Sequence, residues 1–187
     1  TNEELFQRAL ELLAFANAHA HEQILFSKST IDAPVAFSDA NLGVHRSTTG
    51  FCVYLANAAV IAISQAQKCI VLSSCEAELV ALSACACEVM WLRNFLDELG
   101  FGTDAPTAIY CDNTAAKAVA ENPVAAKQLR HVARRHFFVQ DAVRAGAITV
   151  PHVSSEANLA DCLTKLLPSS PRFDWAAARL RSWVMAA

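Results

Sequence analysis

Three acidic residues lie where a packed domain would be expected to carry apolar side chains. Asp39 closes a short apolar run that begins at Pro34, and Asp112 closes another at residues 107–111. Glu78 falls on the apolar side of a helical pattern between them. Acids at the ends of adjacent strands in an α/β sheet point into one crevice, where ligands usually bind. Carboxylates gathered there raise one another's pKa and cost stability unless cations neutralise them.

Such a cluster favours hard divalent cations. Oxygen ligands without imidazole or thiolate are typical of Mg²⁺ or Mn²⁺ sites, and two such ions about 4 Å apart form the clamp used in phosphodiester hydrolysis. Each acid also has an ordinary structural interpretation, which the sequence leaves open. These are an Asx turn at Asp39, a helix N-cap at Asp112 and an ion pair between Glu78 and an arginine.

The elements that would position these acids follow from the hydrophobic periodicity. Strands are predicted over residues 34–39, 51–56 and 59–64, with a turn at Asn57 and a further candidate strand over 69–72. A long helix is predicted from Ser73 or Ser74 to Leu99, with Gly100 as its C-terminal signal. Its apolar stripe, extended backwards, meets Glu78 and then Cys75, whereas Glu76 lies off the stripe. The apolar stripe itself consists of Leu82, Cys85, Val89, Leu92, Leu96 and Leu99.

The remaining elements alternate between strand and helix. They are a helix over residues 4–21, a strand over 107–111, a helix over 114–121, a basic helical segment up to Arg144, a strand over 147–153, and a last helix from Ser154 or Ser155 to about Leu167. This order predicts the α/β class, with a mixed sheet flanked by helices. On that last helix Asp161 lies opposite the apolar stripe, so spacing alone predicts a solvated acid.

Composition limits the kind of protein this can be. The 187 residues suit one domain or one domain with a short appendage, and 54% hydrophobic residues can form a real core. A net charge of −3 and a pI near 6.0 exclude a global basic field. Residues 127–144 form a local basic patch, which could equally be a solvated helix face.

Cysteine usage and hydropathy bear on location. The seven cysteines are odd in number, contain no Cys-x-x-Cys and sit mostly in apolar runs, so we expect an intracellular, reducing compartment and no zinc site. Residues 47–67 are uncharged and long enough for a membrane span, but their polar residues favour two strands. The acidic N-terminus lacks a signal-peptide pattern, and its first residue, Thr1, suggests a processed or excised chain.

A series of short motifs resembles the RNase H domain of Pol polyproteins from copia-type LTR retrotransposons. Each motif is weak alone, but their serial order over nearly the whole chain is specific. The motifs are Ser38-Asp39-Ala40, Arg46-Ser47-Thr48-Thr49-Gly50-Phe51, the segment 72–82 around Glu76-Ala77-Glu78, Trp91-Leu92-Arg93, Ile109-Tyr110-Cys111-Asp112-Asn113, Asn122-Pro123, Arg135-His136-Phe137 and Leu159-Ala160-Asp161-Cys162-Leu163-Thr164-Lys165.

The resemblance implies an RNase H-like fold with a mixed five-stranded sheet, three antiparallel strands followed by parallel ones. Residues 1–33 would form an N-terminal helix and a connection-like segment, 34–168 the RNase H-like domain and 169–187 a helical tail. The implied catalytic and metal-binding residues are Asp39, Glu78, Asp112 and Asp161, with two Mg²⁺ or Mn²⁺ ions as cofactors and Asp39 bridging them. The implied reaction is endonucleolytic hydrolysis of the RNA strand of an RNA/DNA hybrid, with a reverse transcriptase domain as a possible partner.

Substrate contacts are expected from several polar residues. Asn113, Ser47 and Thr48 are candidates for sugar or phosphate contacts, and Arg130, Arg134 and Arg135 for the DNA backbone. In such a fold, groove shape and 2′-hydroxyl contacts select the substrate. A histidine near the last acid assists product release in related enzymes, but the spacing to Asp161 favours an ordinary strand-end role for His152.

The sequence also departs from the family pattern. After Ser-Asp-Ala the family usually continues Asp-Trp-Ala-Gly-Asp, whereas residues 41–45 read Asn-Leu-Gly-Val-His. The usual Lys-His-Ile-Asp is Arg-His-Val-Ala at residues 130–133. An alternative hypothesis is therefore a domesticated RNase H-like domain that serves as a structural or nucleic-acid-binding subunit, because a fold can outlive its chemistry. An integrase-like transferase is disfavoured by the order and spacing of the acids.

Overall fold

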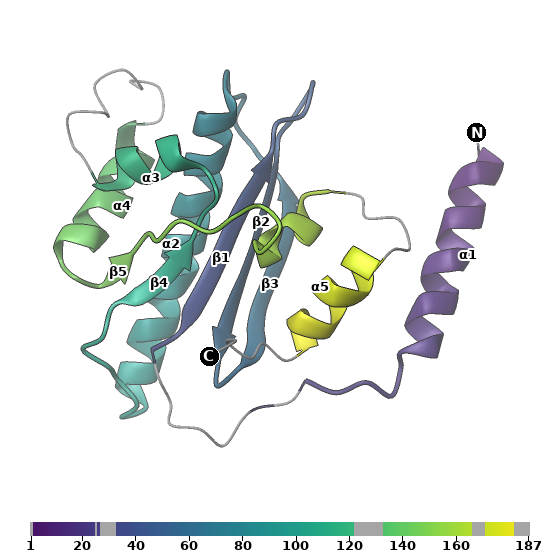
Figure 1. The fold of residues 1–187 in the computed structure, drawn as a ribbon, viewed down its shortest axis with the longest axis horizontal. Helices are drawn as coiled ribbons and strands as arrows, with labels where there is room; N and C mark the ends of the chain where they lie inside the picture. The colour runs from purple at the N-terminus through teal and green to yellow at the C-terminus, as the bar shows by residue number, and fades with distance from the viewer. Residues whose placement is uncertain (1, 25, 27–32, 122–132, 166–170, 182–187) are drawn as a thin grey trace.

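A five-stranded mixed sheet forms the centre of the protein (Figure 1). The computed structural model describes residues 2–24, 26, 33–121, 133–165 and 171–181. The strand order is β3-β2-β1-β4-β5, in which β1–β2 and β2–β3 pair antiparallel and β1–β4 and β4–β5 pair parallel. The predicted fold class is therefore confirmed. The strands are β1 (Val35–Asn41), β2 (Thr48–Leu55), β3 (Ala58–Ala66), β4 (Thr107–Tyr110) and β5 (Ile148–Thr149).

The uncharged stretch at residues 47–67 forms the β2–β3 hairpin. Its turn is made by Ala56 and Asn57, with φ angles of 50° and 64°, and positive φ at both central residues is typical of a type I′ hairpin turn. The predicted turn at Asn57 is confirmed. The predicted strand over residues 69–72 is wrong: the segment has no strand pairing, and Ile70 and Leu72 are 83% and 80% exposed.

Helix α2 (Ser74–Glu98) covers one face of the sheet. Ser73 caps its N-terminus by accepting a hydrogen bond from the Glu76 N–H, and the Glu76 carboxylate in turn accepts from the Leu72 N–H. This reciprocal arrangement resembles a capping box and accounts for the burial of Glu76, which lies off the predicted stripe. The predicted stripe is buried from Leu82 to Leu96, but Leu99 is 55% exposed because the helix ends beside it.

By length and composition α2 could also cross a membrane, and it is the one helix in the described ranges of which this is true. However, 56% of its most apolar stretch is buried within the protein. Its hydrophobicity is therefore already accounted for by the core that it forms with the sheet and with Ile109, Val119 and Val139.

Two further helices extend this layer. Helices α3 (Thr114–Glu121) and α4 (Ala133–Arg144) pack against α2 and against each other. The buried Gln140 side chain donates to the Val119 carbonyl at 2.7 Å and joins the two helices. Strand β5 is shorter than predicted, and the chain beyond it returns to the sheet through an isolated parallel bridge between His152 and Cys111.

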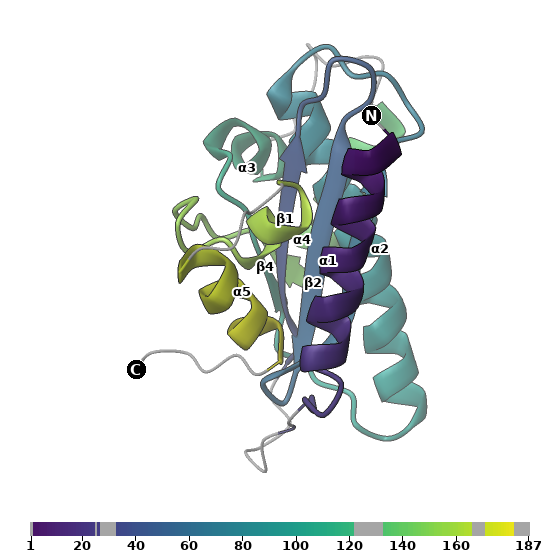
Figure 2. The same cartoon turned by 90° about the vertical axis from the view of Figure 1, so that its right-hand side faces the viewer.

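A smaller core lies on the other face of the sheet. Phe37, Cys52 and Tyr54 pack there against Leu159 and Ala160 of a 3₁₀ helix, η3 (Leu159–Leu163). Helix α5 (Pro171–Arg181) lies beside η3 on this face, opposite α2 (Figure 2). The long last helix predicted from residues 154–155 to 167 is wrong, because the described part of this segment forms a turn and then η3; residues 166–167 lie outside the described ranges.

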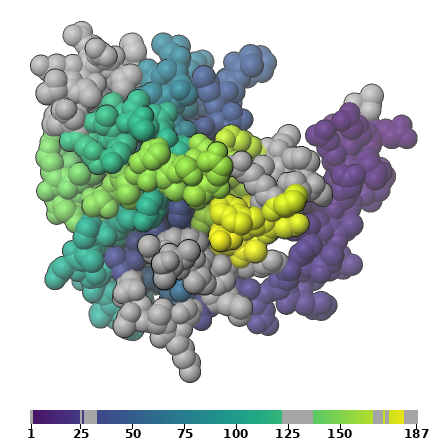
Figure 3. All heavy atoms as spheres, in the orientation of Figure 1, coloured from purple at the N-terminus to yellow at the C-terminus, as the bar shows by residue number. Residues whose placement is uncertain are grey.

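Helix α1 (Asn2–Ala18) stands apart from both cores. It has no buried residue, and the space-filling view places it at one edge of the molecule (Figure 3). Its apolar side chains are exposed; among them are Leu5, Phe6, Leu10, Leu12, Leu13 and Phe15.

Candidate metal centre

The sheet register brings Asp39 and Asp112 to the same edge. Phe37 of β1 is paired with Tyr110 of β4 in parallel, and each aspartate follows two residues later, so both reach the carboxyl end of the parallel pair. Strand β1 continues past Asp39 to Asn41, and Asp39 itself pairs with Gly50. Asp39 therefore lies within a strand rather than in an Asx turn, and it is only 2% exposed.

Glu78 reaches the same edge from the start of α2. It is 6% exposed, and its Oε2 atom has no hydrogen-bond partner among the described residues. Burial, followed by the charges of Asp39 and Asp112, raises the pKa of Glu78 to about 8, while a hydrogen bond with the Ala40 backbone opposes this. The ion pair with an arginine, left open by the sequence, is not formed in the described part of the chain.

Asp112 lies just beyond β4. Its Oδ2 accepts a hydrogen bond from the Ser155 hydroxyl at 2.6 Å. It does not cap α3: Asn113 does, because its Oδ1 accepts from the N–H groups of Ala115 and Ala116, each at 3.0 Å. The structure thus leaves the Asp112 carboxylate directed to the site rather than to the helix.

A cysteine accompanies two of the acids. One ligand atom from each of Glu78, Cys111 and Asp112 lies within 4.8 Å of the others, which the sequence did not predict. Burial and the Glu78 charge raise the pKa of the Cys111 thiol to about 12. The thiol therefore stays protonated, and a neutral thiol is a poor ligand for a hard cation.

Asp161 is buried, contrary to the prediction from helix spacing. It is 2% exposed because η3 lies on the sheet and carries the acid toward β1. Asn158 caps η3 by accepting from the Ala160 N–H at 3.1 Å, and its amide donates to the Ser38 carbonyl at 3.0 Å. One asparagine thus fixes η3 beside the residue that precedes Asp39.

The two residues that follow η3 bind two of the acids. The Thr164 hydroxyl donates to Asp39 Oδ2, and the Lys165 ammonium donates to Asp161 Oδ1. Burial raises the pKa of Asp39, the Thr164 hydrogen bond opposes that rise, and the charges of Asp112 and Asp161 add to it. Because both acids raise the pKa of Asp39, all four carboxylates form one electrostatically coupled cluster.

Gly50 is what allows η3 to approach so closely. A Cβ atom at this position would lie 2.6 Å from Thr164 Cγ2, 2.9 Å from Leu163 Cβ and 3.0 Å from the Ala160 carbonyl oxygen. Such distances are shorter than packed side chains adopt. Since Gly50 pairs with Asp39, the missing side chain makes room for η3 directly beside the cluster.

The residues predicted to bind substrate are more dispersed. Asn113 caps α3, Ser47 is 2% exposed with a hydroxyl that has no hydrogen-bond partner among the described residues, and Thr48 is half-buried at the start of β2. Arg134 and Arg135 belong to α4, but their side chains lie outside what is described, as does the whole of Arg130. His152 is exposed and pairs with Cys111 in the isolated parallel bridge beyond β5.

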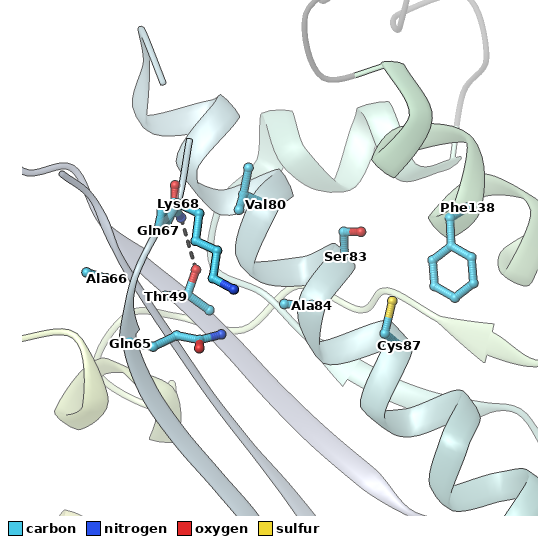
Figure 4. Close-up of a pocket in the computed structure, with 10 residues that line it drawn as sticks. All are labelled: Thr49, Gln65, Ala66, Gln67, Lys68, Val80, Ser83, Ala84, Cys87 and Phe138. Atoms are coloured by element: carbon cyan, nitrogen blue, oxygen red, sulfur yellow. Dashed lines mark hydrogen bonds between the residues drawn. The ribbon is translucent and has the colours of Figure 1, made fainter. Parts of the chain in front are cut away.

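A hollow of about 410 Å³ lies along α2, between the end of the β2–β3 hairpin and α4 (Figure 4). Lys68 and Gln65 extend toward it from the hairpin side, and Phe138 forms the far wall. The Gln67 side chain lines the hollow, and its amide donates to the Thr49 hydroxyl at 3.0 Å and to the Ala77 carbonyl at 2.9 Å. Its wall includes Val80, two residues after Glu78.

Four residues important to the site were not singled out from the sequence. Gly50, Thr164 and Lys165 lie in motifs used for the resemblance, but no role was assigned to them, and Asn158 lies in none. An Asn immediately before an apolar Leu-Ala pair is a recognisable capping signal. The contacts of Gly50 with η3 join residues more than 100 positions apart, so no local pattern could have revealed them.

The architecture is that of the RNase H fold. The N-terminal RNase H domain of a Mycobacterium tuberculosis protein, solved as a fusion with maltose-binding protein, superposes with a TM-score of 0.52. The match covers 78% of this chain and 96% of that structure at 16% identity, which shows the fold alone. No protein-family model matches the chain.

Two curated relatives are similar to this chain over most of its length. The chain is 34% identical over 169 residues to the retrovirus-related Pol polyprotein from transposon RE1 of Arabidopsis thaliana, and 36% identical over 165 residues to that from transposon RE2 of the same plant. These matches cover 88% and 86% of this chain but only 12% and 11% of those polyproteins. The resemblance predicted from the motifs is confirmed: the chain is homologous to a segment of the Pol polyproteins of copia-type retrotransposons.

Proposed function

We propose that this chain is a ribonuclease H that hydrolyses the RNA strand of RNA/DNA hybrids with the help of two divalent cations. The observation that carries the proposal is the carboxylate cluster at the carboxyl end of the β1–β4 pair, in which Asp39, Glu78 and Asp161 are buried and Asp112 is half-buried. The RNase H fold and the homology to Pol polyproteins support the same activity.

The residues present fit a pair of hard cations. The donors are carboxylate oxygens, and the buried Glu78 Oε2 has no hydrogen-bond partner in the described part of the chain. Burial and like charges raise the pKa of Glu78 and Asp39, so the ionised form of each carboxyl is unfavourable. A bound cation would stabilise that ionised form. Bound there, Mg²⁺ or Mn²⁺ would activate a water for in-line attack and stabilise charge on the phosphoryl group, leaving 5′-phosphate and 3′-hydroxyl ends.

The chain itself fixes the orientation of the carboxylate ligands. Thr164 holds the Asp39 carboxylate in one orientation, and Ser155 does the same for Asp112. Fixed ligands of this kind need little reorganisation during reaction. In this assignment Asp39, Glu78, Asp112 and Asp161 would hold the ions, and Glu78 would have to lose its proton before it could act as a ligand.

Substrate recognition would fall to groups around this edge. Asn113 keeps its amide NH₂ for a sugar hydroxyl while its oxygen caps α3. Ser47 and Thr48 are proposed to contact sugar or phosphate, and Arg130, Arg134 and Arg135 the DNA backbone. A reverse transcriptase domain is the proposed partner, because the relatives are Pol polyproteins of which this chain spans about an eighth. An intracellular, reducing compartment is proposed from the buried thiols of Cys52, Cys85 and Cys111.

Cleavage of an end-labelled RNA/DNA hybrid tests the proposal. The wild-type chain with Mg²⁺ should release RNA fragments, and Asp112→Asn should reduce this by about 10³-fold, since a ligand charge to the cations contributes several kcal/mol. Far-ultraviolet circular dichroism checks that both proteins are folded. Intact RNA in both lanes, with Mn²⁺ also tried, would refute the enzyme.

A second candidate function is a non-catalytic subunit of a larger assembly. The exposed apolar side chains of α1, none of whose residues is buried, favour it, because exposed apolar patches commonly mark interaction surfaces. The same hybrid assay separates the two functions. A folded, inactive wild-type chain that still binds the hybrid would support the subunit.

A further inference from the structure

Lys165 places a positive charge at the edge of the acid cluster. Its ammonium donates to Asp161 Oδ1, and the Asp161 side chain is 3% exposed whereas that of Lys165 is 47% exposed. The Lys165 charge lowers the pKa of both Asp39 and Glu78. The hydrogen bond to Asp161 raises the pKa of Lys165, and the charges of Asp39 and Asp112 act in the same direction. Lys165 therefore interacts with the whole cluster rather than with Asp161 alone.

The backbone anchors this ammonium without enclosing it. The Lys165 and Thr164 N–H groups both donate to the Asp161 carbonyl, at 3.1 and 3.2 Å, so the start of the side chain is fixed relative to the acid. The long aliphatic stem is half in solvent. By rotation about its own bonds, a lysine side chain in this setting can leave the Asp161 carboxylate and bind water instead.

We propose that Lys165 is a tethered cation that neutralises the acid cluster when no divalent ion is bound, and that it must release Asp161 before such an ion can use that carboxylate. The first half of this inference stands on the contacts alone. The second half rests on the proposed metal centre. Lys165 is thus a positioning residue, which sets the metal affinity through Asp161.

Two effects of opposite sign follow for a variant without the ammonium. Removing it leaves the buried Asp161 charge without its cation, so the metal-free protein loses stability. Removing it also frees Asp161 for an incoming divalent ion, so metal binding becomes tighter. A residue with a purely structural role would produce the first effect but not the second.

The variant Lys165→Met tests both effects, and Lys117→Met is its matched control. Lys117 also pairs with an acid four residues away, Glu121, at 3.8 Å, but the Glu121 side chain is 48% exposed whereas that of Asp161 is 3% exposed. In EDTA we expect the thermal midpoint of Lys165→Met to fall by roughly 2–6 °C, with little change for Lys117→Met. Mn²⁺ binding, followed by electron paramagnetic resonance of the free ion, should tighten about tenfold in Lys165→Met alone. Lys165→Arg, which keeps the charge, should restore the midpoint and the weaker binding.

Other results would contradict the proposed role of Lys165 or the metal centre on which it depends. Equal midpoints for the two methionine variants in EDTA, or Mn²⁺ affinity unchanged by Lys165→Met, would overturn the tether. Weaker binding of the hybrid with unchanged Mn²⁺ affinity would overturn it as well and make Lys165 a substrate contact. If neither wild type nor Lys165→Met binds Mn²⁺, the proposed metal centre is wrong. The thermal midpoints measured in EDTA then still test, independently of any metal, whether Lys165 neutralises the acid cluster.

Discussion

The two sides of the acid cluster differ in how their negative charge is balanced. On one side Asp39 and Asp161 each receive a hydrogen bond from the residues that follow η3, one of them from a cation. On the other side Asp112 receives only a neutral serine hydroxyl among its described hydrogen bonds, and Glu78 Oε2 has none. Glu78 and Asp112 therefore receive no hydrogen bond from a cation among the described residues, and burial together with the neighbouring acids raises the pKa of Glu78.

The elements that supply each side explain this difference. Glu78 and Asp112 come from a long helix and a central strand, whose positions are fixed by the main core. The partners of Asp39 and Asp161 come from an irregular segment that rests on the smaller core. A rigid core can hold unfavourable charge in place because the cost is distributed over many packed residues. The main core therefore holds the carboxylates on the Glu78 side in place, as the proposed cation site requires.

The largest expected effects come from a comparison of Glu78→Gln with Asp161→Asn, which tests the difference between the two sides of the cluster. Both should reduce hydrolysis of the hybrid by about 10³-fold, since each removes a charged ligand. Their effects on metal-free stability should differ. Asp161→Asn leaves Lys165 without its buried partner and should lower the free energy of unfolding by about 1–3 kcal/mol, whereas Glu78→Gln should leave it unchanged or higher.

Urea unfolding in EDTA at pH 8 measures both changes. Because the two variants each remove one negative charge from the same cluster, each serves as the control for the other. An equal loss of stability in both would contradict the asymmetry.

The three acids carried by or following regular elements were also the ones that the sequence pattern predicted. Asp39 and Asp112 follow apolar strand patterns, and Glu78 continues a helical stripe, so periodicity alone identified all three. Helix spacing predicts a solvated Asp161, but its segment forms η3, a 3₁₀ helix with a different periodicity. Only the family resemblance assigned Asp161 to the site. Its burial depends on Gly50 and Asn158, whose contacts with distant residues leave no local pattern.

The same asymmetry should appear in the pH dependence of stability. Glu78 has an ordinary pKa of 4.5 and a folded-state pKa of about 8. Between these values the unfolded chain releases this proton while the folded chain keeps it, so the free energy of unfolding falls as pH rises, by at most about 1.4 kcal/mol for each pH unit. Below pH 4.5 this group contributes no loss, and above pH 8 the loss is complete.

The pH effect is measured as the difference between wild type and Glu78→Gln. Chemical unfolding in EDTA from pH 5 to 9 should show a wild-type stability that declines relative to the variant. Saturating Mg²⁺ should reverse the decline, because the cation binds the ionised carboxylate. Parallel curves in EDTA would show that Glu78 ionises normally and that its side of the cluster is not strained.

The smallest predicted effect concerns the close approach of η3, which Gly50 permits. Gly50→Ala should lower the free energy of unfolding by about 1–3 kcal/mol, because η3 must shift away from an added Cβ. The shift would move Thr164 and Lys165 from Asp39 and Asp161 but leave Glu78 and Asp112 in place. Thr164→Ser in the same chain removes the methyl group at 2.6 Å and should recover part of the stability.

Gly102→Ala is the matched control for Gly50→Ala. Its Cβ would meet the carboxylate end of the Asp97 side chain, at 2.3 Å, which can rotate away. We therefore expect this variant to lose less stability and no hydrolytic activity. If Gly50→Ala matched it in both respects, η3 could move without cost. That result would contradict the proposed difference between the two sides, in which the main core fixes Glu78 and Asp112 and the close packing of η3 holds the partners of Asp39 and Asp161.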